Sequence, residues 1–307
     1  MISSKSPVDI LITIITETVR IASLLGNGFI TVVEGHQWLR NRKMLSCDVL
    51  LISLTTSRFV MELHSSVSGL LYLISSETWS SKQAYLYIVW IFFNMLSLWS
   101  ATWLSVFYCV KVTNFANRVF HWLKQRINML APRLLGWSMV ISSIFFLLPL
   151  VEYFGHKKWD NLTLTPPGWA NPRGDLHKPL YIFLPLQLTY TSINFTISIT
   201  ASIILLASLW KHTRNLKKSG VGDKDLSTQV HINVIMLLLC YVFFYFLYFS
   251  SMILFVSKVV KYGTTAKQVL DLLAATFPCA HAIILILTNP KLKEMAAHIL
   301  NIRQRAS

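Results

Sequence analysis

Five long stretches of this sequence contain no Asp, Glu, Lys or Arg, and they limit the possible folds more than any other feature. They cover residues 83–110, 134–151, 179–210, 226–257 and 272–290. Roughly 20 apolar residues in a helix cross a bilayer core about 30 Å thick, so each stretch is a candidate transmembrane span. Two further apolar runs, 8–33 and 47–72, carry a few charges and bring the expected number of spans to seven.

The composition also indicates that lipid is the solvent of this chain. Only 13% of the 307 residues are charged, against roughly 25% in soluble domains. A hydrophobic content of 54% excludes a disordered chain, and four cysteines are too few for a disulfide scaffold. The net charge of +15 would suggest nucleic acid, but the basic residues lie in short runs between apolar segments, as in membrane loops.

We therefore predict an all-α membrane protein with one domain, residues 1–307, folded as a seven-transmembrane helix bundle. The expected spans cover about 8–33, 47–72, 84–110, 134–153, 180–210, 231–257 and 268–288. The connections 34–46, 111–133 and 211–230, with the tail 289–307, hold roughly twice as many Lys and Arg residues as the other side. This side should face the cytoplasm, which places the N-terminus outside and the C-terminus inside.

The second outer loop, expected at 154–179, supports this orientation. It contains Asn161-Leu162-Thr163, an acceptor triplet for N-glycosylation. The loop is rich in Pro and Gly and should be irregular and exposed. A second triplet begins at Asn194, inside the fifth span, and should stay unmodified. We therefore predict a glycoprotein that carries glycan at Asn161.

Several strings along nearly the whole chain resemble one receptor family. They are Gly26-Asn27-Gly28-Phe29-Ile30, Leu54-Thr55-Thr56-Ser57-Arg58, Leu98-Trp99-Ser100-Ala101-Thr102, Leu104-Ser105-Val106-Phe107-Tyr108, Ser208-Leu209-Trp210-Lys211-His212-Thr213, and Asn289-Pro290-Lys291-Leu292-Lys293. They are similar to the strings of the bitter taste receptors, a family of G-protein-coupled receptors. The rhodopsin-like Asp-Arg-Tyr and Asn-Pro-x-x-Tyr motifs are missing. Ala282 stands where the family usually has Ser, and Val234-Ile235-Met236 replaces Ala-Leu-Lys, so coupling efficiency is expected to differ.

The resemblance implies a multi-pass plasma-membrane receptor that needs no cofactor. Bitter small molecules would bind in an extracellular-side cavity of the bundle and activate a gustducin-class heterotrimeric G protein. An enzyme is not expected, because the sequence has no Gly-rich phosphate loop, nucleophile elbow or metal-binding Cys/His cluster. The alternative is a transporter or channel for small solutes, which commonly shows inverted repeats. We find no such matching halves.

Four residues are candidates for agonist binding. Trp90 and Asn94 are spaced i, i+4 and share a helix face, and the resemblance places both in the ligand pocket. Asp271, near the outer end of the seventh span, resembles a ligand-contacting acid and would complement cationic amines. Each has an alternative interpretation. Trp90 could lie at the lipid interface, and Asn94 could form a hydrogen bond between helices. Asp271 could be an acid at a helix N-terminus that the helix dipole favours. By the same resemblance, Tyr248 matches an aromatic residue that members of the family place beneath the ligand.

Tyr241, Tyr245 and Tyr248 are not expected to share one face of the sixth span. Most of these tyrosines should therefore face lipid or fill packing space. Glu17 and Arg20, spaced i, i+3 in the first span, should form an ion pair.

Arg58 lies inside the second span, where a guanidinium costs roughly 2.5–3.5 kcal/mol and needs partners. By resemblance we expect a polar hub with Asn27 that joins the first, second and seventh helices. The alternative is that Arg58 extends to the inner interface.

Basic residues at the inner helix ends are candidates for contact with the G protein. They are Lys111, Lys211, His212, Lys217 and Lys218. A simpler interpretation is that these charges set the topology and bind anionic membrane lipid.

Overall fold

The computed structural model describes residues 6–41, 45–74, 76–113, 118–162, 178–218, 226–257, 260 and 264–299. These residues form eight helices and no strand. The helices are α1 (Pro7–Asn41), α2 (Ser46–Ile74), α3 (Ser76–Val112), α4 (Arg118–Leu162), α6 (Lys178–Lys218), α7 (Leu226–Val256), α8 (Thr265–Thr288) and α9 (Pro290–Ile299).

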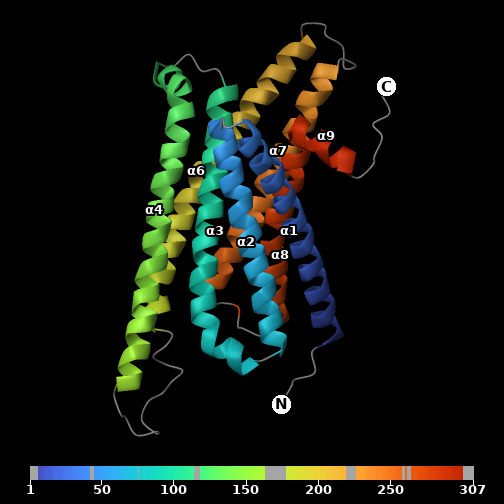
Figure 1. Cartoon of the computed structure of the whole chain (residues 1–307). Helices are drawn as coiled ribbons and strands as arrows, with labels where there is room; N and C mark the ends of the chain where they lie inside the picture. Colours follow the sequence, from blue (N-terminus) through green and yellow to red (C-terminus); the bar gives the residue numbers. More distant parts are fainter. Residues whose placement is uncertain are drawn as a thin grey trace.

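The long helices stand side by side in one bundle, and the short α9 lies at an angle across one end (Figure 1). α1 packs against both α2 and α8, α8 against α7, α7 against α6, and α6 against α3. Since α3 also packs against α2 and α4, the helices form a closed ring with α3 as its most connected member.

The ring closes where the first long helix meets the last. A Cβ atom on Gly26 of α1 would lie 3.2 Å from the Cβ of Ala282 on α8, which is tighter than an ordinary contact. The glycine therefore lets the two backbones approach closely, as small residues do at helix interfaces inside membranes.

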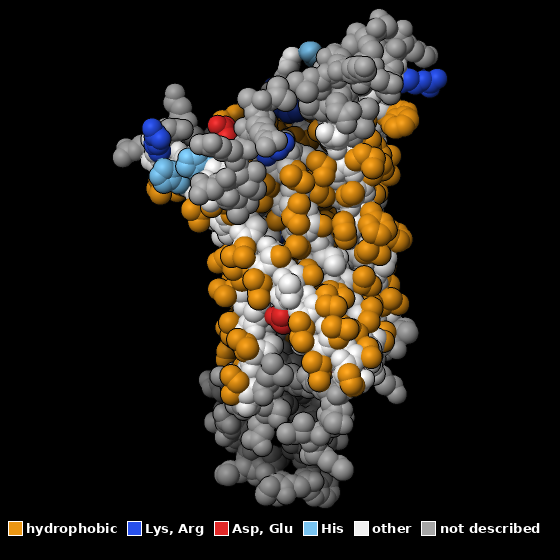
Figure 2. All heavy atoms as spheres, turned by 90° about the vertical axis from the view of Figure 1, so that its right-hand side faces the viewer, with side chains coloured by type: hydrophobic (Ala, Val, Ile, Leu, Met, Phe, Trp, Pro, Cys, Tyr) orange, Lys and Arg blue, Asp and Glu red, His pale blue; other side chains and the backbone are white. Residues whose placement is uncertain are grey.

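The outer surface of the bundle is hydrophobic. Large apolar side chains such as Leu25 and Val32 of α1 are 66% and 69% exposed. On the face shown in Figure 2, hydrophobic side chains cover much of the described part of the bundle, and Lys and Arg side chains lie near the end that carries α9. A soluble protein would not expose such a surface, so the fold is that of a helical membrane protein.

Five of the described helices contain segments long and apolar enough to cross a membrane. These segments are Tyr85–Val112, Phe120–Val151, Pro185–Asn215, Asn233–Val256 and Thr265–Thr288. The expected spans 8–33 and 47–72 are helical within α1 and α2 but lie outside this group because of their charges. The seven-span topology and the orientation of the termini therefore stay predictions.

Helix α4 is longer at both ends than the sequence suggested. It begins at Arg118, inside the expected inner loop 111–133, because Ile127, Ala131 and Leu135 recur every four residues and pack into the core. It continues through Leu162, so residues 154–162 are helical and not irregular. Asn161 thus lies in the last turn of a helix, while its side chain and Thr163 lie outside the described residues.

Candidate functional site

A cavity of about 170 Å³ lies between α3, α7 and α8, toward the end of the bundle opposite α9. Its lining, which defines what we call the Asp271 cavity, consists of Tyr87, Trp90, Ser251, Met252, Phe255, Lys267, Leu270, Asp271 and Ala274. Two of the four candidate ligand residues, Trp90 and Asp271, therefore line the same space. Ligand binding in this space stays a prediction.

Aromatic rings form one wall of the Asp271 cavity. The rings of Tyr87 and Trp90 stack with centroids 6.0 Å apart and planes 16° apart. Tyr87 also contacts Phe255 of α7 at a centroid distance of 6.1 Å. The Tyr87 hydroxyl donates to Oε1 of Gln187 at 3.4 Å, which links the ring to α6. Such flat rings offer apolar area and electron-rich faces to a ligand.

The part of the lining that comes from α8 carries an ion pair. The Lys267 ammonium donates to the Asp271 carboxylate one turn along α8, and its Nζ lies 4.9 Å from the centroid of the Phe255 ring. The Asp271 side chain is 43% exposed and that of Lys267 is 13% exposed. Lys267 lies one residue before the expected span 268–288 and was not predicted as a site residue, although its i, i+4 spacing to Asp271 is evident in the sequence.

The other two candidate ligand residues bond to each other beside this cavity. The Tyr248 hydroxyl donates to Oδ1 of Asn94 at 2.6 Å, which joins α7 to α3. Both side chains are almost fully buried, and neither lines the cavity. For Asn94 the structure thus contains the inter-helix hydrogen bond that was the alternative interpretation.

The expectation that the three α7 tyrosines would not share one face of the helix was wrong. Tyr241, Tyr245 and Tyr248 are all buried, because residues at i, i+4 and i+7 share one face of a helix with 3.6 residues per turn. The Tyr245 hydroxyl donates to Oδ1 of Asn194 at 2.5 Å, and the Tyr241 hydroxyl lies 2.9 Å from the Ser198 hydroxyl. These three residues, which we call the tyrosine row, therefore face the interior and hold α7 to its neighbours.

Arg58 is fully buried in the middle of the bundle. Its Nε donates to the Ser97 hydroxyl of α3 at 3.2 Å, and one terminal nitrogen lies 2.9 Å from Nδ1 of His281 on α8. The guanidinium carbon also lies 4.8 Å from the centroid of the Phe277 ring. Arg58 therefore joins three helices and does not extend to the inner interface.

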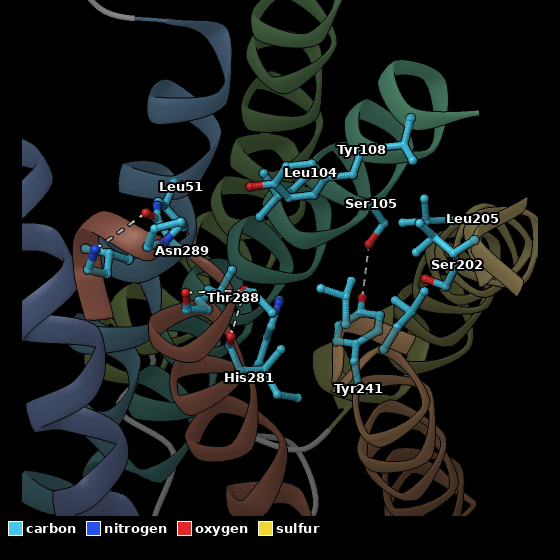
Figure 3. Close-up of a pocket in the computed structure, with 18 residues that line it drawn as sticks. Leu51, Leu104, Ser105, Tyr108, Ser202, Leu205, Tyr241, His281, Thr288 and Asn289 are labelled. Carbon is cyan, nitrogen blue, oxygen red and sulfur yellow. Dashed lines mark hydrogen bonds between the residues drawn. The ribbon is translucent and has the colours of Figure 1, made fainter. Parts of the chain in front are cut away.

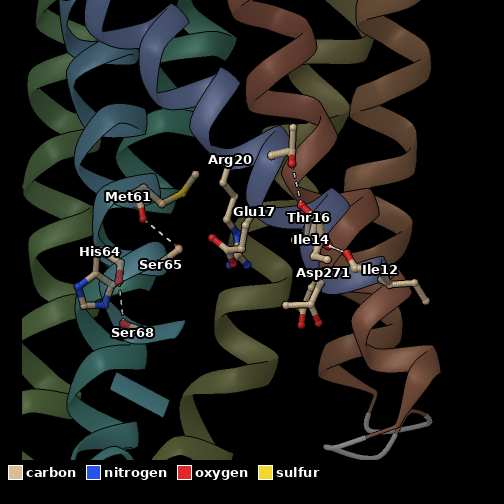
Figure 4. Close-up of polar contacts among 12 residues, drawn as sticks. Ile12, Ile14, Thr16, Glu17, Arg20, Met61, His64, Ser65, Ser68 and Asp271 are labelled. Atoms are coloured by element: carbon tan, nitrogen blue, oxygen red, sulfur yellow. Dashed lines mark hydrogen bonds and ion pairs between the residues drawn. The ribbon is translucent and has the colours of Figure 1, made fainter. Parts of the chain in front are cut away.

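Asn27 is not a bonding partner of Arg58. Its amide nitrogen turns back along α1 and donates to the Ser23 carbonyl at 2.8 Å, and its Oδ1 has no hydrogen-bond partner among the described residues. The ion pair expected in α1 is present, because a terminal nitrogen of Arg20 lies 2.6 Å from a Glu17 carboxylate oxygen. Figure 4 shows this pair and Asp271 of α8 in the same part of the bundle.

A second cavity, of about 470 Å³, opens between the helices at the α9 end. We call it the Tyr241 cavity, and Figure 3 shows its lining side chains, which come from α2, α3, α6, α7, α8 and the start of α9. Tyr241 accepts a 3.4 Å hydrogen bond from Ser105 here. Most of the other lining residues are apolar, Leu104, Leu205 and Leu285 among them.

Three of the basic residues expected to contact the G protein lie close in sequence to lining residues of the Tyr241 cavity, on α3 and α6. Lys111 is exposed next to Val112 on α3, and Lys211 and His212 are exposed beyond Leu209 on α6. The Lys111 ammonium lies 5.7 Å from the centroid of the Phe107 ring. The backbones of residues 217 and 218 end α6, and their side chains lie outside the described set.

Comparison with known proteins relates nearly the whole chain to one family. The family model described as taste receptor protein (TAS2R) matches residues 1–304. Taste receptor type 2 member 8 of Pan paniscus is 28% identical over 309 residues that cover 98% of both chains. Member 40 of Gallus gallus is 32% identical, with 92% of this chain and 91% of the relative covered. Member 10 of Papio hamadryas is 31% identical, with 95% and 92% covered.

Proposed function

Because this chain belongs to the taste receptor type 2 family of G-protein-coupled receptors, we propose that it binds bitter small molecules in the Asp271 cavity and activates a gustducin-class G protein at the Tyr241 cavity. One observation carries this proposal. The two cavities lie toward opposite ends of one helix bundle, and the tyrosine row of α7 runs between them.

The charge distribution supports a side of the membrane for each cavity. The segments expected on the α9 side hold most of the Lys and Arg residues, and cytoplasmic loops carry such an excess. In this orientation the seven long helices cross the membrane with the N-terminus outside. The Asp271 cavity then opens toward the extracellular side, and the Tyr241 cavity opens toward the cytoplasm.

The lining of the Asp271 cavity suits a small amphipathic agonist. Trp90 and Tyr87 provide flat apolar surface, and Asp271 provides a partly exposed carboxylate. Few polar groups among apolar and aromatic ones are typical of small-molecule sites. A cationic amine would gain from both the carboxylate and the ring faces.

The Tyr241 cavity suits the apolar face of a helix from a partner protein. An amphipathic helix can bury its hydrophobic residues in such a groove. Lys111, Lys211 and His212 beside the cavity would attract acidic residues on the same partner and speed its association. These features support a G-protein helix as the occupant.

The tyrosine row offers a physical connection between the two cavities. Tyr248 bonds to Asn94, one turn from the cavity residue Trp90, while Tyr241 lines the other cavity. An agonist that binds more tightly to one arrangement of α3 and α7 shifts the population toward that arrangement. The shift would change the shape of the Tyr241 cavity and hence its affinity for the G protein.

Replacement of Trp90 tests the ligand site. Losing a large aromatic wall should cost on the order of 2 kcal/mol, about thirtyfold in agonist potency. We expect this loss for Trp90→Ala in a calcium assay that co-expresses a gustducin-class α subunit and applies a panel of bitter compounds. Trp137→Ala is the matched control, because Trp137 lies on α4 and is 68% exposed.

Surface expression must be equal for both variants and the parent. If Trp90→Ala and Trp137→Ala give the same dose–response curves as the parent receptor, the agonist does not bind in the Asp271 cavity. If the parent raises calcium only through other G-protein classes, the assignment of the partner is wrong.

A further inference from the structure

We propose that Lys267 is a tethered cation that occupies the cation-binding part of the Asp271 cavity, so that a cationic agonist has to displace it. This inference rests on the proposed agonist site. It adds a residue that determines which charge class of agonist the receptor prefers.

The surroundings of the Lys267 ammonium are those of a bound organic cation. The ammonium pairs with the Asp271 carboxylate and lies 4.9 Å from the centroid of the Phe255 ring. A carboxylate combined with an aromatic face is how proteins recognise ammonium ligands. The Lys267 ammonium thus already occupies the place where the ammonium group of a ligand would bind.

The ion pair is placed so that it can open. A Lys that precedes its acidic partner by four residues is the weaker orientation of a helical pair. Lys267 also lies in the first turn of α8, where the helix dipole disfavours a positive charge. The four-carbon stem of Lys allows the ammonium to swing out to water while Asp271 and Phe255 stay in place.

Competition with an internal cation has a defined effect on affinity. The apparent dissociation constant rises by the inverse of the fraction of receptors whose site is open. If the pair is formed in about nine molecules of ten, a cationic agonist binds roughly tenfold more weakly than it would without Lys267. A neutral agonist gains nothing from the carboxylate and should be nearly insensitive to the loss of this charge.

Two probes of nearly equal shape separate these cases. Benzyltrimethylammonium carries a positive charge, and neopentylbenzene is its neutral carbon analogue. Binding of each probe to the full-length receptor in lipid nanodiscs is measured by isothermal titration calorimetry. For Lys267→Met, which keeps the apolar stem, we expect about tenfold tighter binding of benzyltrimethylammonium and a change below twofold for neopentylbenzene.

Two controls fix the interpretation. Lys267→Arg keeps the tethered charge and should bind both probes as the parent does. Lys293→Met removes an exposed charge on α9, far from the cavity, and should also leave both affinities unchanged.

Unchanged or weaker binding of benzyltrimethylammonium to Lys267→Met overturns the inference, as does failure of this probe to bind either form. The proposed agonist site is judged separately by Trp90→Ala in the calcium assay. If Trp90→Ala lowers potency while Lys267→Met has no effect, the agonist site stands and only the role of Lys267 is wrong.

Discussion

Arg58 and Asp271 are both ionisable residues inside the helix bundle, yet their surroundings give them different roles. Arg58 is fully buried and has fixed partners in Ser97 and His281 on two other helices. Asp271 is partly exposed to a cavity, and its partner Lys267 comes from the same helix. The contacts of Arg58 thus tie helices together, whereas Asp271 borders the cavity that we propose as the agonist site.

The Asp271→Asn variant separates charge from shape at this position. The amide keeps the size and polarity of the side chain but removes its attraction for cations. We expect cationic agonists to lose about tenfold in potency, roughly 1.4 kcal/mol, and neutral agonists to be spared. Calcium dose–response curves at matched surface expression measure this, with Glu294→Gln on the exposed surface of α9 as the control. Equal loss for both agonist classes would mean that Asp271 has a structural role.

At the scale of elements, hydrogen bonds from tyrosine hydroxyls fasten α7 to its neighbours. Tyr248 bonds to Asn94 on α3, and Tyr245 bonds to Asn194 on α6. Lipid is as apolar as the side chains around it, so membrane helices associate through packing and such inter-helix bonds. The position of α7 relative to α3 and α6 is therefore set by a few specific contacts.

Tyr248→Phe removes one of these contacts and leaves Oδ1 of Asn94 buried without a donor. An unsatisfied buried polar group costs roughly 1–3 kcal/mol. We expect a lower melting temperature for this variant in nanodiscs, measured by a thiol-reactive dye or by loss of monodispersity. Tyr85→Phe, on the exposed side of α3, should melt as the parent does.

A double-mutant cycle assigns that loss to the bond itself. Asn94→Leu combined with Tyr248→Phe replaces both polar partners by apolar groups, and the pair should cost less than the sum of the single changes. Strictly additive losses would show that the hydroxyl and the amide do not depend on each other.

At the scale of the whole molecule, the features combine into a closed ring with a hydrophobic exterior and a basic end. α1 contacts α8, so the ring is complete only when both are present. The basic end carries α9. There the Lys291 ammonium of α9 forms an ion pair with the Glu34 carboxylate of α1 at a distance of 3.2 Å. This pair fixes α9 against the bundle on the side that we assign to the cytoplasm.

The proposed orientation is tested by glycosylation. Asn161 should reach the lumenal side and carry glycan, while Asn194 is fully buried and accepts a hydrogen bond from Tyr245. We expect treatment with a peptide-N-glycosidase to shift the parent receptor on a gel. Asn161→Gln should run at the deglycosylated position without treatment. A glycosidase shift that persists in Asn161→Gln would contradict the orientation.

Much of the bundle could be predicted from the long stretches without charged residues, because charged side chains are costly in the hydrocarbon core of a bilayer. The limits of α4 could not, since charged residues such as Lys124 and Arg126 suggested a loop. In the structure the Arg126 guanidinium lies 5.2 Å from the centroid of the Trp122 ring. The apolar face of this segment, which includes Ile127, packs into the core, while Arg126 stays on the exposed side of the same helix.

For the candidate sites, spacing along one helix was informative and partners on other helices were not. The i, i+3 pair of Glu17 and Arg20 was predicted. The shared face of the α7 tyrosines follows from the same helix geometry, but the prediction did not include it. The contact between Arg58 and His281 joins residues 223 positions apart. No local pattern determines such a contact, so it required the folded structure.

That separation has a consequence for how the receptor is made. A ribosome adds about 5–20 residues per second, so roughly 10 to 45 seconds pass between synthesis of Arg58 and synthesis of His281, which lies 223 positions later. In the proposed topology the nascent α2 therefore waits in the bilayer with its guanidinium incompletely partnered. Until α8 is made, the Arg58 guanidinium lacks His281, and a charge in the bilayer without its partners is costly. The stability of this intermediate therefore depends on how well the helices already made, and the lipid around them, accommodate the guanidinium.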